Sequence, residues 1–367
     1  MSDKSNIAWT NSTWNPVTGC AKVSPGCKHC YAEREWPRFY GREEVAVQLT
    51  HGPIVDGRQI TEIQGKRPFT HVVCHEDRLD IPLRWKRPRR IFVNSMSDLF
   101  HEKVPDAFID RVFAVMAQAP QHTFQILTKR PERMLRWFDP GRDNREHSVG
   151  EAMRALTQGK DPGLPDWPLP NVWIGVSVED QGTANERIPL LLETPAAVRW
   201  VSAEPLLGLV DLDLAGCIDG CGWVTPVPCN NDKDLKCPKC RAIVTRCGFG
   251  RSHGGIMRRR PLDWVVVGGE SGPYARPMHS EWARSILRQC CDARIPVFIK
   301  QLGAAYSDPK NGIVGHGLRV HPDWQALISL RLQHRAGADP SEWPEDLRVR
   351  EFPDPSASGQ AIREGIV

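Results

Sequence analysis

The sequence predicts an α/β fold in which a parallel sheet curls into a partial or complete (β/α) barrel. Short apolar runs rich in β-branched residues alternate with segments of helical periodicity, as in parallel sheets with crossover helices. Nearly every run ends in polar residues, and barrels build their sites from the carboxyl ends of many strands. An open doubly wound sheet, which gathers ligand groups at one switch point, is the alternative. The 367 residues suffice for one such domain with an insertion, or for two ordinary domains.

Seven apolar runs are the predicted strands. Most are continuous and β-branched, as expected of strands buried on both faces of a sheet. They cover residues 71–75, 90–98, 124–130, 172–180, 198–205, 263–271 and 297–303.

Helical segments lie between these strands. Residues 104–120 have Pro105 near their start and repeat apolar side chains at helical spacing. Residues 130–138 follow the third predicted strand, residues 184–195 the fourth and residues 279–296 the sixth.

Two regions interrupt the alternation. Residues 139–170 are rich in Pro, Gly and charge, which predicts a surface excursion with one short helix. Residues 215–260 carry a cysteine cluster and predict a zinc-binding insertion. The barrel core is therefore expected over residues 1–214 and 261–303, and a helix and coil extension over residues 304–367.

Composition predicts a globular protein without a membrane segment. Hydrophobic residues make up 40% of the chain and charged residues 25%. No apolar run approaches the roughly 20 residues that span a bilayer, and the N-terminus lacks the apolar region of a signal peptide. We therefore expect a cytoplasmic protein. The net charge of +4 is a weak signal, but the basic runs at 84–90 and 257–261 are typical either of phosphate contacts or of a solvated face.

The predicted insertion holds six of the 12 cysteines, which in an intracellular chain indicate metal or redox chemistry rather than disulfides. Cys237 and Cys240 form a CPKC knuckle, from which two thiolates can bind Zn²⁺. Cys217 and Cys221 are the predicted second pair, with Cys229 as the substitute. Such a closed site stabilises a small insertion and takes no direct part in catalysis.

A second group, Cys20, Cys27 and Cys30, lies in one N-terminal loop with no fourth cysteine nearby. A [4Fe–4S] cluster bound by three thiolates keeps one iron open to a small molecule, whereas four thiolates make a closed electron carrier. A zinc site completed by His29 is the alternative on the residues alone.

The spacing of these cysteines resembles the motif of the radical S-adenosylmethionine (radical SAM) superfamily. That motif separates three cysteines by three and then two residues, with an aromatic residue before the last. The second gap matches, with His29 as the aromatic residue, whereas the first gap has six residues.

A closer resemblance covers most of the chain. Seven segments in order are similar to a phage- and prophage-associated three-Cys-motif family of unknown function, usually grouped with radical SAM proteins. They are WNPVTGCAKVSPGCKHCYAE, RIFVNSMSDLFH, ILTKRPERM, VWIGVSVED, RWVSAEPLLG, DWVVVGGESGPYARPM and FIKQLG. The resemblance implies a radical SAM-type barrel, a bacterial or phage-infected cell and a separate partner protein.

It further implies that Cys20, Cys27 and Cys30 ligate a [4Fe–4S] cluster, with S-adenosylmethionine on the open iron. The reduced cluster would release a 5′-deoxyadenosyl radical that abstracts hydrogen from a substrate. The residues expected to contact the cofactor or substrate are His29, Asn94, Ser95, Ser97, Asp98, Lys129 and Arg130. The expected catalytic residues are Glu204, Glu270 and Lys300, although Lys300 is equally suited to pair with either glutamate.

The sequence therefore predicts a radical SAM-like iron–sulfur enzyme. The basic runs and the phage resemblance favour a nucleic acid or nucleotide as the substrate. A non-catalytic, zinc-dependent nucleic-acid-binding or adaptor protein is the alternative. The polar strand ends count against it, because a pure binding protein has little use for acids and bases gathered at one face.

Overall fold

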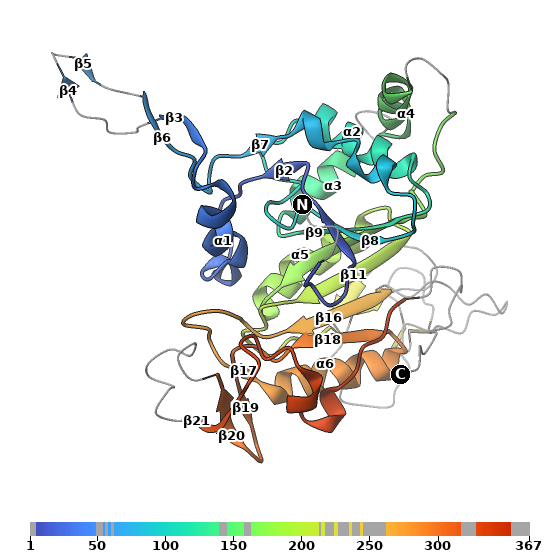
Figure 1. Ribbon diagram of the computed structural model, residues 1–367. Helices are drawn as coiled ribbons and strands as arrows, with labels where there is room; N and C mark the ends of the chain where they lie inside the picture. The colour runs from blue at the N-terminus through green and yellow to red at the C-terminus, as the bar shows by residue number, and fades with distance from the viewer. Residues whose placement is uncertain are drawn as a thin grey trace.

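A seven-stranded, wholly parallel sheet lies at the centre of the protein (Figure 1). The computed structural model describes residues 5–48, 54–55, 58–59, 62–138, 145–157, 163–212, 214–216, 224–226, 235–236, 243–244, 262–316 and 328–353. The sheet consists, in spatial order, of β1 (Ser12–Trp14), β8 (Arg90–Val93), β9 (Thr123–Thr128), β10 (Val172–Val178), β11 (Val198–Ala203), β16 (Trp264–Gly268) and β18 (Val297–Gln301).

This strand order determines the shape of the sheet. Each strand is added at the same edge as the chain proceeds, so the order never reverses and no switch point arises. Successive right-handed crossovers in one direction place the connecting helices on one face and curl the sheet around the other. β1 and β18 end the sheet without pairing with each other, which makes it an open half-barrel. The predicted α/β class is confirmed, in the partial-barrel form.

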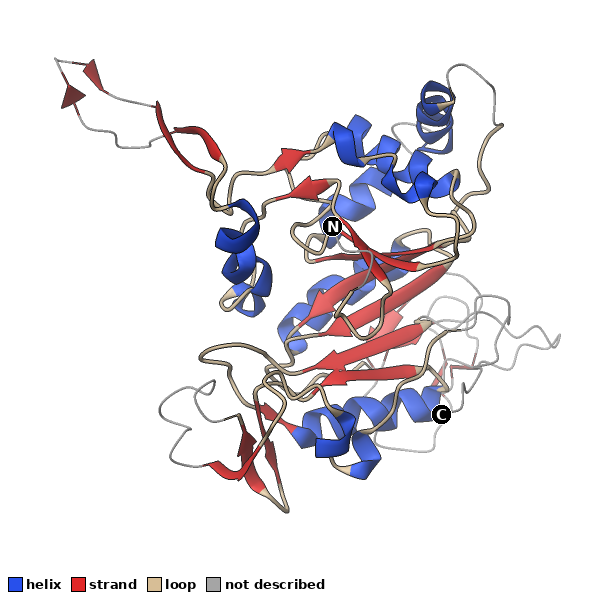
Figure 2. Cartoon of the chain, viewed as in Figure 1, coloured by secondary structure: helices blue, strands red, loops and turns tan. Residues whose placement is uncertain are grey.

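Helices that follow the strands cover the convex face (Figure 2). α2 (Asp106–Ala117) follows β8, α3 (Pro131–Phe138) follows β9, α5 (Gln181–Glu193) follows β10, and α6 (Ser280–Ala293) belongs to the β16–β18 connection. α4 (Arg145–Leu156), the helix of the 139–170 region, packs on α2. Alternate strand residues such as Ile91, Val93, Val265 and Val267 join these helices in the main core.

The segment between β1 and β8 carries the cysteine loop. β2 (Val17–Thr18) pairs antiparallel with β7 (Val73–Cys74). The chain then passes through the 3-10 turn Pro25–Cys27 into α1 (Tyr31–Tyr40), whose Trp36 and Tyr40 pack with Phe69. β3 (Glu44–Gln48) and β6 (Glu62–Lys66) form a hairpin that projects from the body, and β4 (Ile54–Val55) pairs with β5 (Arg58–Gln59). The 3-10 turns Glu76–Arg78 and Ile81–Arg84 lead to β8.

Short antiparallel pairs are described within the insertion and next to it. β12 (Leu214–Gly216) pairs with β13 (Val224–Pro226), and β14 (Leu235–Lys236) pairs with β15 (Ile243–Val244). A second sheet has the order β17 (Met278–His279), β19 (Ala305–Asp308), β20 (Gly312–Gly315) and β21 (Ile328–Arg331). The 3-10 turns Pro340–Glu342 and Glu345–Leu347 follow.

The structure differs from the prediction at three points. Residues 71–75 do not join the main sheet, because only Val73–Cys74 are extended and they pair with β2. The main sheet instead begins with β1, whose three residues include two polar ones and so lack the apolar run of a strand. The region from residue 304 onward contains β19, β20 and β21, so the expectation of helix and coil without strands is wrong there.

No described helix is long and apolar enough to cross a lipid bilayer.

Candidate active site

The concave face of the half-barrel has an aromatic floor. Side chains alternate between the two faces of a strand, so residues two positions apart share the concave face. The floor consists mainly of Trp9, Phe92, Trp173, Trp200, Trp264 and Phe298, and the rings of Trp9 and Trp200 meet edge to face at 5.2 Å. Gly175 is required beside this floor, because a Cβ there would lie 2.5 Å from the Trp200 ring. The four tryptophans of the floor are buried.

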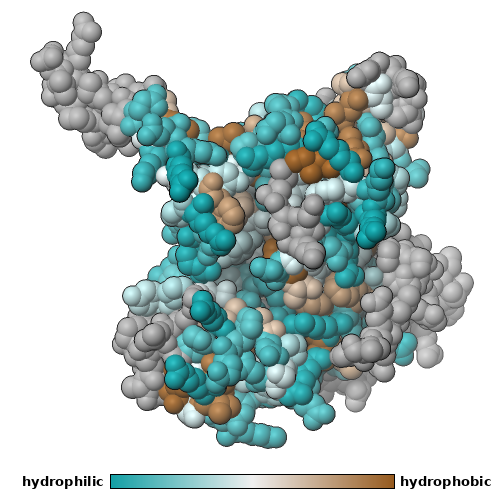
Figure 3. Space-filling view, viewed as in Figure 1, coloured by the Kyte–Doolittle hydropathy of each residue, from teal (hydrophilic) through white to brown (hydrophobic). Residues whose placement is uncertain are grey.

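Above the floor, the carboxyl ends of the strands open into a cavity of about 410 Å³. This volume lies within the range of roughly 300–1,000 Å³ that is typical of small-molecule sites. The strand ends form one side of the cavity, and the cysteine loop with the start of α1 forms the roof. The described surface on the face shown in Figure 3 is mostly hydrophilic.

The structure brings the residues predicted for the cluster, the cofactor and catalysis to this one cavity. Its lining includes Cys20, Cys27, His29, Cys30, Asn94, Ser95, Ser97, Asp98, Lys129, Arg130, Glu204, Glu270 and Lys300. They come from the cysteine loop and from the ends of β8, β9, β11, β16 and β18.

The three thiols of the roof are partly buried and unbridged. Cys20 and Cys30 pack against the apolar cluster that contains Trp36. The pKa of Cys20 is raised to about 12, chiefly by burial and also by the nearby Asp98 carboxylate, whereas the Arg130 guanidinium acts to lower it. Burial also raises the pKa of Cys30. Both groups are therefore neutral thiols near pH 7.

Arg130 places a fixed positive charge beside Cys20. Its Nη1 lies 3.6 Å from Cys20 Sγ and donates to Asp98 Oδ2 at 3.2 Å. Its Nη2 donates to the carbonyl of Ala21 at 3.0 Å, so the same side chain also holds the cysteine loop. A thiolate formed at Cys20 would face this guanidinium.

An arginine–glutamate pair fastens the roof to the end of β16. Arg276 Nη2 donates to Glu270 Oε1 at 2.6 Å, and Arg276 Nε donates to Glu270 Oε2 at 3.0 Å. The same Nη2 donates to the carbonyl of Pro25 in the cysteine loop at 3.1 Å. His29 Nδ1 lies 3.3 Å from Glu270 Oε2. Glu270, a predicted catalytic residue, thus has both carboxylate oxygens engaged in holding the roof.

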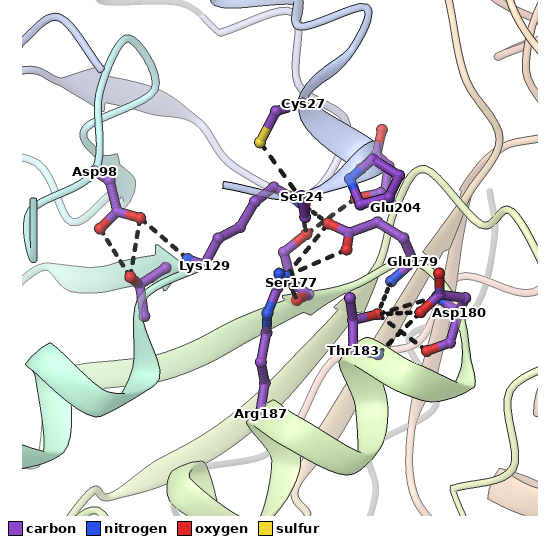
Figure 4. Close-up of polar contacts among 12 residues, drawn as sticks. Ser24, Cys27, Asp98, Lys129, Ser177, Glu179, Asp180, Thr183, Arg187 and Glu204 are labelled. Atoms are coloured by element: carbon purple, nitrogen blue, oxygen red, sulfur yellow. Dashed lines mark hydrogen bonds and ion pairs between the residues drawn. The ribbon is translucent and has the colours of Figure 1, made fainter. Parts of the chain in front are cut away.

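Two cations share the buried carboxylate of Glu179 beneath the cysteine loop (Figure 4). Lys129 Nζ donates to Glu179 Oε1, and to Ser177 Oγ at 2.7 Å. Arg187 Nη1, from α5, lies 3.3 Å from Glu179 Oε2 and donates to the carbonyl of Ser177 at 2.7 Å. The Glu179 side chain has no exposed surface.

A second ion pair joins the ends of β11 and β18. Lys300 Nζ donates to Glu204 Oε1 at 2.6 Å, and Gln301 Nε2 donates to the same oxygen at 3.3 Å. Of the two glutamates predicted as partners of Lys300, the structure therefore pairs it with Glu204. The Glu204 carboxylate therefore pairs with a single ammonium group, that of Lys300.

The end of β8 holds a donor without a partner. Asn94 has a left-handed φ of 62°, and its Oδ1 accepts from the Val17 backbone N–H at 3.1 Å. Its Nδ2 is buried and has no hydrogen-bond partner in the described part of the chain. Ser97 Oγ instead donates to the Val17 carbonyl at 2.8 Å, and Asp98 accepts from Thr128 Oγ1 at 2.8 Å. Ser97 and Asp98 thus hold the loop, whereas no described residue accepts from the Asn94 amide nitrogen.

The possible metal donors of the roof are three cysteines and one histidine of a single loop, Cys20, Cys27, His29 and Cys30. The described residues include no group of three or more His, Cys, Asp or Glu side chains that could hold one metal ion. A Cys₃His zinc site would need four donors to converge within about 2.0–2.3 Å of one point. A [4Fe–4S] cluster takes one thiolate per iron, so its ligands surround it instead of converging.

Two predicted features lie outside the described residues. They are the zinc ligands Cys217, Cys221, Cys229, Cys237 and Cys240, and the basic run at 257–261.

The other basic run is partly engaged within the protein. Arg84 Nη2 donates to Asp80 at 2.5 Å, the Arg89 guanidinium lies 4.6 Å from the Trp85 ring, and the Arg90 guanidinium lies 3.9 Å from the Phe352 ring.

Several residues of the site were not predicted from the sequence, among them Gly26, Glu179, Arg187 and Arg276. Arg187 and Arg276 neutralise buried acids at strand ends, and Gly26 allows the cysteine loop to lie against Glu179. The positions of the two arginines in the sequence could have indicated them. Arg187 follows Glu179 by eight residues on the next helix, and Arg276 follows Glu270 by six. A buried carboxylate needs a cation as its partner, and these arginines are close to the glutamates along the chain.

Residues 4–339 match the family described as "Protein of unknown function (DUF5131)". The chain belongs to this family. The match extends from the cysteine loop through β18 to the second sheet, so every cavity residue named above lies within the part that matches the family. No curated protein and no solved structure matches the chain significantly.

Proposed function

We propose that this chain is an iron–sulfur enzyme of the radical SAM type that modifies or repairs a nucleotide or nucleic acid. One observation carries the proposal: three thiols and the polar ends of six parallel strands line the same cavity. Barrel enzymes assemble their catalytic groups at the carboxyl ends of the strands. Three thiols above that mouth, with no fourth cysteine in the loop, suit a cluster with one open iron.

In this proposal Cys20, Cys27 and Cys30 would ligate a [4Fe–4S] cluster. Arg130 supports ligation at Cys20, because its guanidinium lies 3.6 Å from the sulfur and favours the thiolate. When bound, the cluster and S-adenosylmethionine would supply the electron transfer that yields a 5′-deoxyadenosyl radical.

The remaining residues of the chain bind, orient and shield. Arg276 and Glu270 hold the cysteine loop over the cavity, which limits the access of water to a reactive intermediate. The Lys300–Glu204 pair, with the ammonium nitrogen 2.6 Å from Glu204 Oε1, can give or take a proton at the cavity wall. Ser95 and His29 also line the cavity and are proposed to contact the cofactor.

The rest of the proposal concerns the setting of the enzyme. A nucleotide or nucleic acid is proposed because of the basic runs and the phage resemblance. Zinc is proposed at Cys217, Cys221, Cys237 and Cys240, with Cys229 as the substitute, in a structural role. The proposal also includes a separate partner protein, and it places the enzyme in the cytoplasm of a bacterium or a phage-infected host cell.

The decisive experiment is anaerobic reconstitution with iron and sulfide, followed by dithionite and S-adenosylmethionine. We expect a brown protein with cluster absorbance that forms 5′-deoxyadenosine, and we expect Cys27→Ala to lose both properties. Cys291→Ala is the matched control, because Cys291 is an exposed cysteine of α6 that lies outside the cavity. Equal cluster absorbance in Cys27→Ala and Cys291→Ala would exclude the cysteine loop as the cluster site.

The same preparation tests the rival class. A colourless protein that retains zinc and forms no 5′-deoxyadenosine would refute the enzyme and favour a zinc-dependent binding or adaptor protein. Cys237→Ala should lower the zinc content while sparing the cluster absorbance, since its thiol belongs to the separate insertion. Loss of the cluster in that variant would contradict the division into two metal sites.

A further inference from the structure

Three linked side chains at one end of the cavity carry an excess of positive charge. Lys129 and Arg187 both contact the carboxylate of Glu179, so these three side chains hold two positive charges and one negative charge. Glu179 has no exposed surface and the Arg187 side chain is only 2% exposed. Glu186 lies 4.0 Å from Arg187, but it is 56% exposed and therefore screened by water. Because Glu179 and Arg187 are shielded from water, the uncompensated positive charge favours the binding of an anion.

Lys129 presents this charge to the cavity. Its side chain is 22% exposed and lines the cavity wall. An ammonium group has three N–H donors, and Ser177 and Glu179 accept from it. No further acceptor for Lys129 Nζ is found in the described part of the chain, which leaves the remaining donor to a ligand.

Asn94 supplies an independent sign of a missing ligand. It lies at the end of β8, the strand next to β9, and its side chain also lines the cavity. The residue is 3% exposed, and its Nδ2 has no hydrogen-bond partner among the described residues. A buried amide donor without an acceptor costs free energy, which a bound acceptor group would recover.

We propose that Lys129 and Asn94 form an anion-binding end of the cavity, and that the molecule bound there carries an oxyanion, either phosphoryl or carboxylate. The Lys300–Glu204 pair is balanced one to one and does not share this excess. The inference rests on the proposed function for the reaction that uses the site, and it adds the chemistry of the group that the site recognises.

Binding is best measured on the protein purified without iron. Two ligand pairs separate the sources of the oxyanion: AMP against adenosine for a phosphoryl group, and methionine against its amide for a carboxylate. We expect at least one anionic member to bind about tenfold or more tightly than its neutral or amide counterpart, by isothermal titration calorimetry. Equal affinities within both pairs would overturn the inference.

Asn94→Asp is the sharpest variant. The aspartate keeps the Oδ1 acceptor for Val17 and tolerates the left-handed φ of 62°, but it replaces the free donor with a negative charge. We expect it to abolish the preference for the anion with an unchanged circular dichroism spectrum. Lys129→Met should abolish the preference as well, and it leaves Glu179 paired with Arg187. Lys129→Arg should restore part of it.

The matched control is Arg111→Met, which removes a positive charge from α2 outside the cavity. It should leave the preference unchanged. If Arg111→Met and Lys129→Met lost the preference for the anion equally, the preference would depend only on the net charge of the protein, which would contradict the inference. Cluster reconstitution of the same variants is a separate readout. The anion preference can therefore be absent while the cluster still forms, which would refute only this inference. Cluster formation can equally fail while the anion preference is present, which would refute only the iron–sulfur proposal.

Discussion

Gly26 in the cysteine loop lies directly against the buried carboxylate of Glu179 at the end of β10. A Cβ at position 26 would lie 2.4 Å from Glu179 Cγ and 2.6 Å from Glu179 Oε1. The height of the cysteine loop above the strand ends therefore depends on a residue without a side chain. Glu179 in turn is held by Lys129 and Arg187, so the loop rests on a fixed ionic group.

Gly26→Ala should displace the cysteine loop, because the new methyl group overlaps a side chain that two cations hold in place. We expect the free energy of unfolding to fall by about 1–3 kcal/mol, the usual cost of overpacking, as measured by urea denaturation. Gly182→Ala is the control, since a Cβ there meets Asp180 Oδ1 at an ordinary 3.5 Å. Equal stabilities of the two variants would mean that the contact between Gly26 and Glu179 has no consequence.

Glu179→Gln should be more costly. The substitution leaves Lys129 and Arg187 together in a buried site without a carboxylate. Removal of one partner from a buried ion pair lowers the free energy of unfolding by about 3–5 kcal/mol. Glu76→Gln breaks the pair with Arg111 in which Glu76 is 62% exposed, and it should cost less than about 1 kcal/mol. Urea denaturation of both variants checks the ranking, and a reversed order would refute the importance of the shared carboxylate.

Much of this architecture follows from local patterns in the sequence. The runs around Val93, Val176 and Val266 are continuous and β-branched because both faces of a parallel sheet are covered. Polar residues such as Lys129 and Glu204 directly follow such runs, and parallel strands bring their carboxyl ends to one edge. The buried strands and the polar residues that follow them were therefore sufficient to predict where the cavity lies and many of the residues that line it.

What could not be predicted depends on contacts between distant segments. β1 is too short to carry a hydrophobic period, and it becomes a strand only because β8 pairs with it. Gly26 and Glu179 have no relation along the chain, so their contact arises only after the loop folds over β10. The link between Glu270 and the cysteine loop has the same origin, because Arg276 contacts both the Glu270 carboxylate and the Pro25 carbonyl of that loop.

The partly buried thiol of Cys20 should make the protein less stable at alkaline pH. Its pKa is raised from 9.0 to about 12 in the folded protein, chiefly by burial. Between these pH values the unfolded chain releases a proton that the folded chain retains, so the free energy of unfolding falls as the pH rises. Urea denaturation with a reductant, at pH values from about 8 to about 10, should show this slope. It should be shallower in Cys20→Ala and unchanged in Cys291→Ala, whose thiol is exposed. Identical slopes in all three proteins would contradict the raised pKa.

Arg276→Lys should loosen the roof of the cavity without unfolding the sheet. Lysine keeps the positive charge, but it cannot donate to both oxygens of Glu270 and to the Pro25 carbonyl with one planar group. We expect hydrogen exchange of the amides in residues 24–30 to become about tenfold faster, which corresponds to the loss of one charge-assisted hydrogen bond. Amides of β10 should keep their protection.

Arg288→Lys is the matched control for the roof variant. Arg288 is 65% exposed and its nearest carboxylate, on Glu281, lies 3.9 Å away, so the change removes no fixed contact. Its exchange pattern should match that of the unaltered protein. If Arg276→Lys also left residues 24–30 fully protected, the cysteine loop would have to be held by Arg130 and its contact with Ala21 instead of by the end of β16.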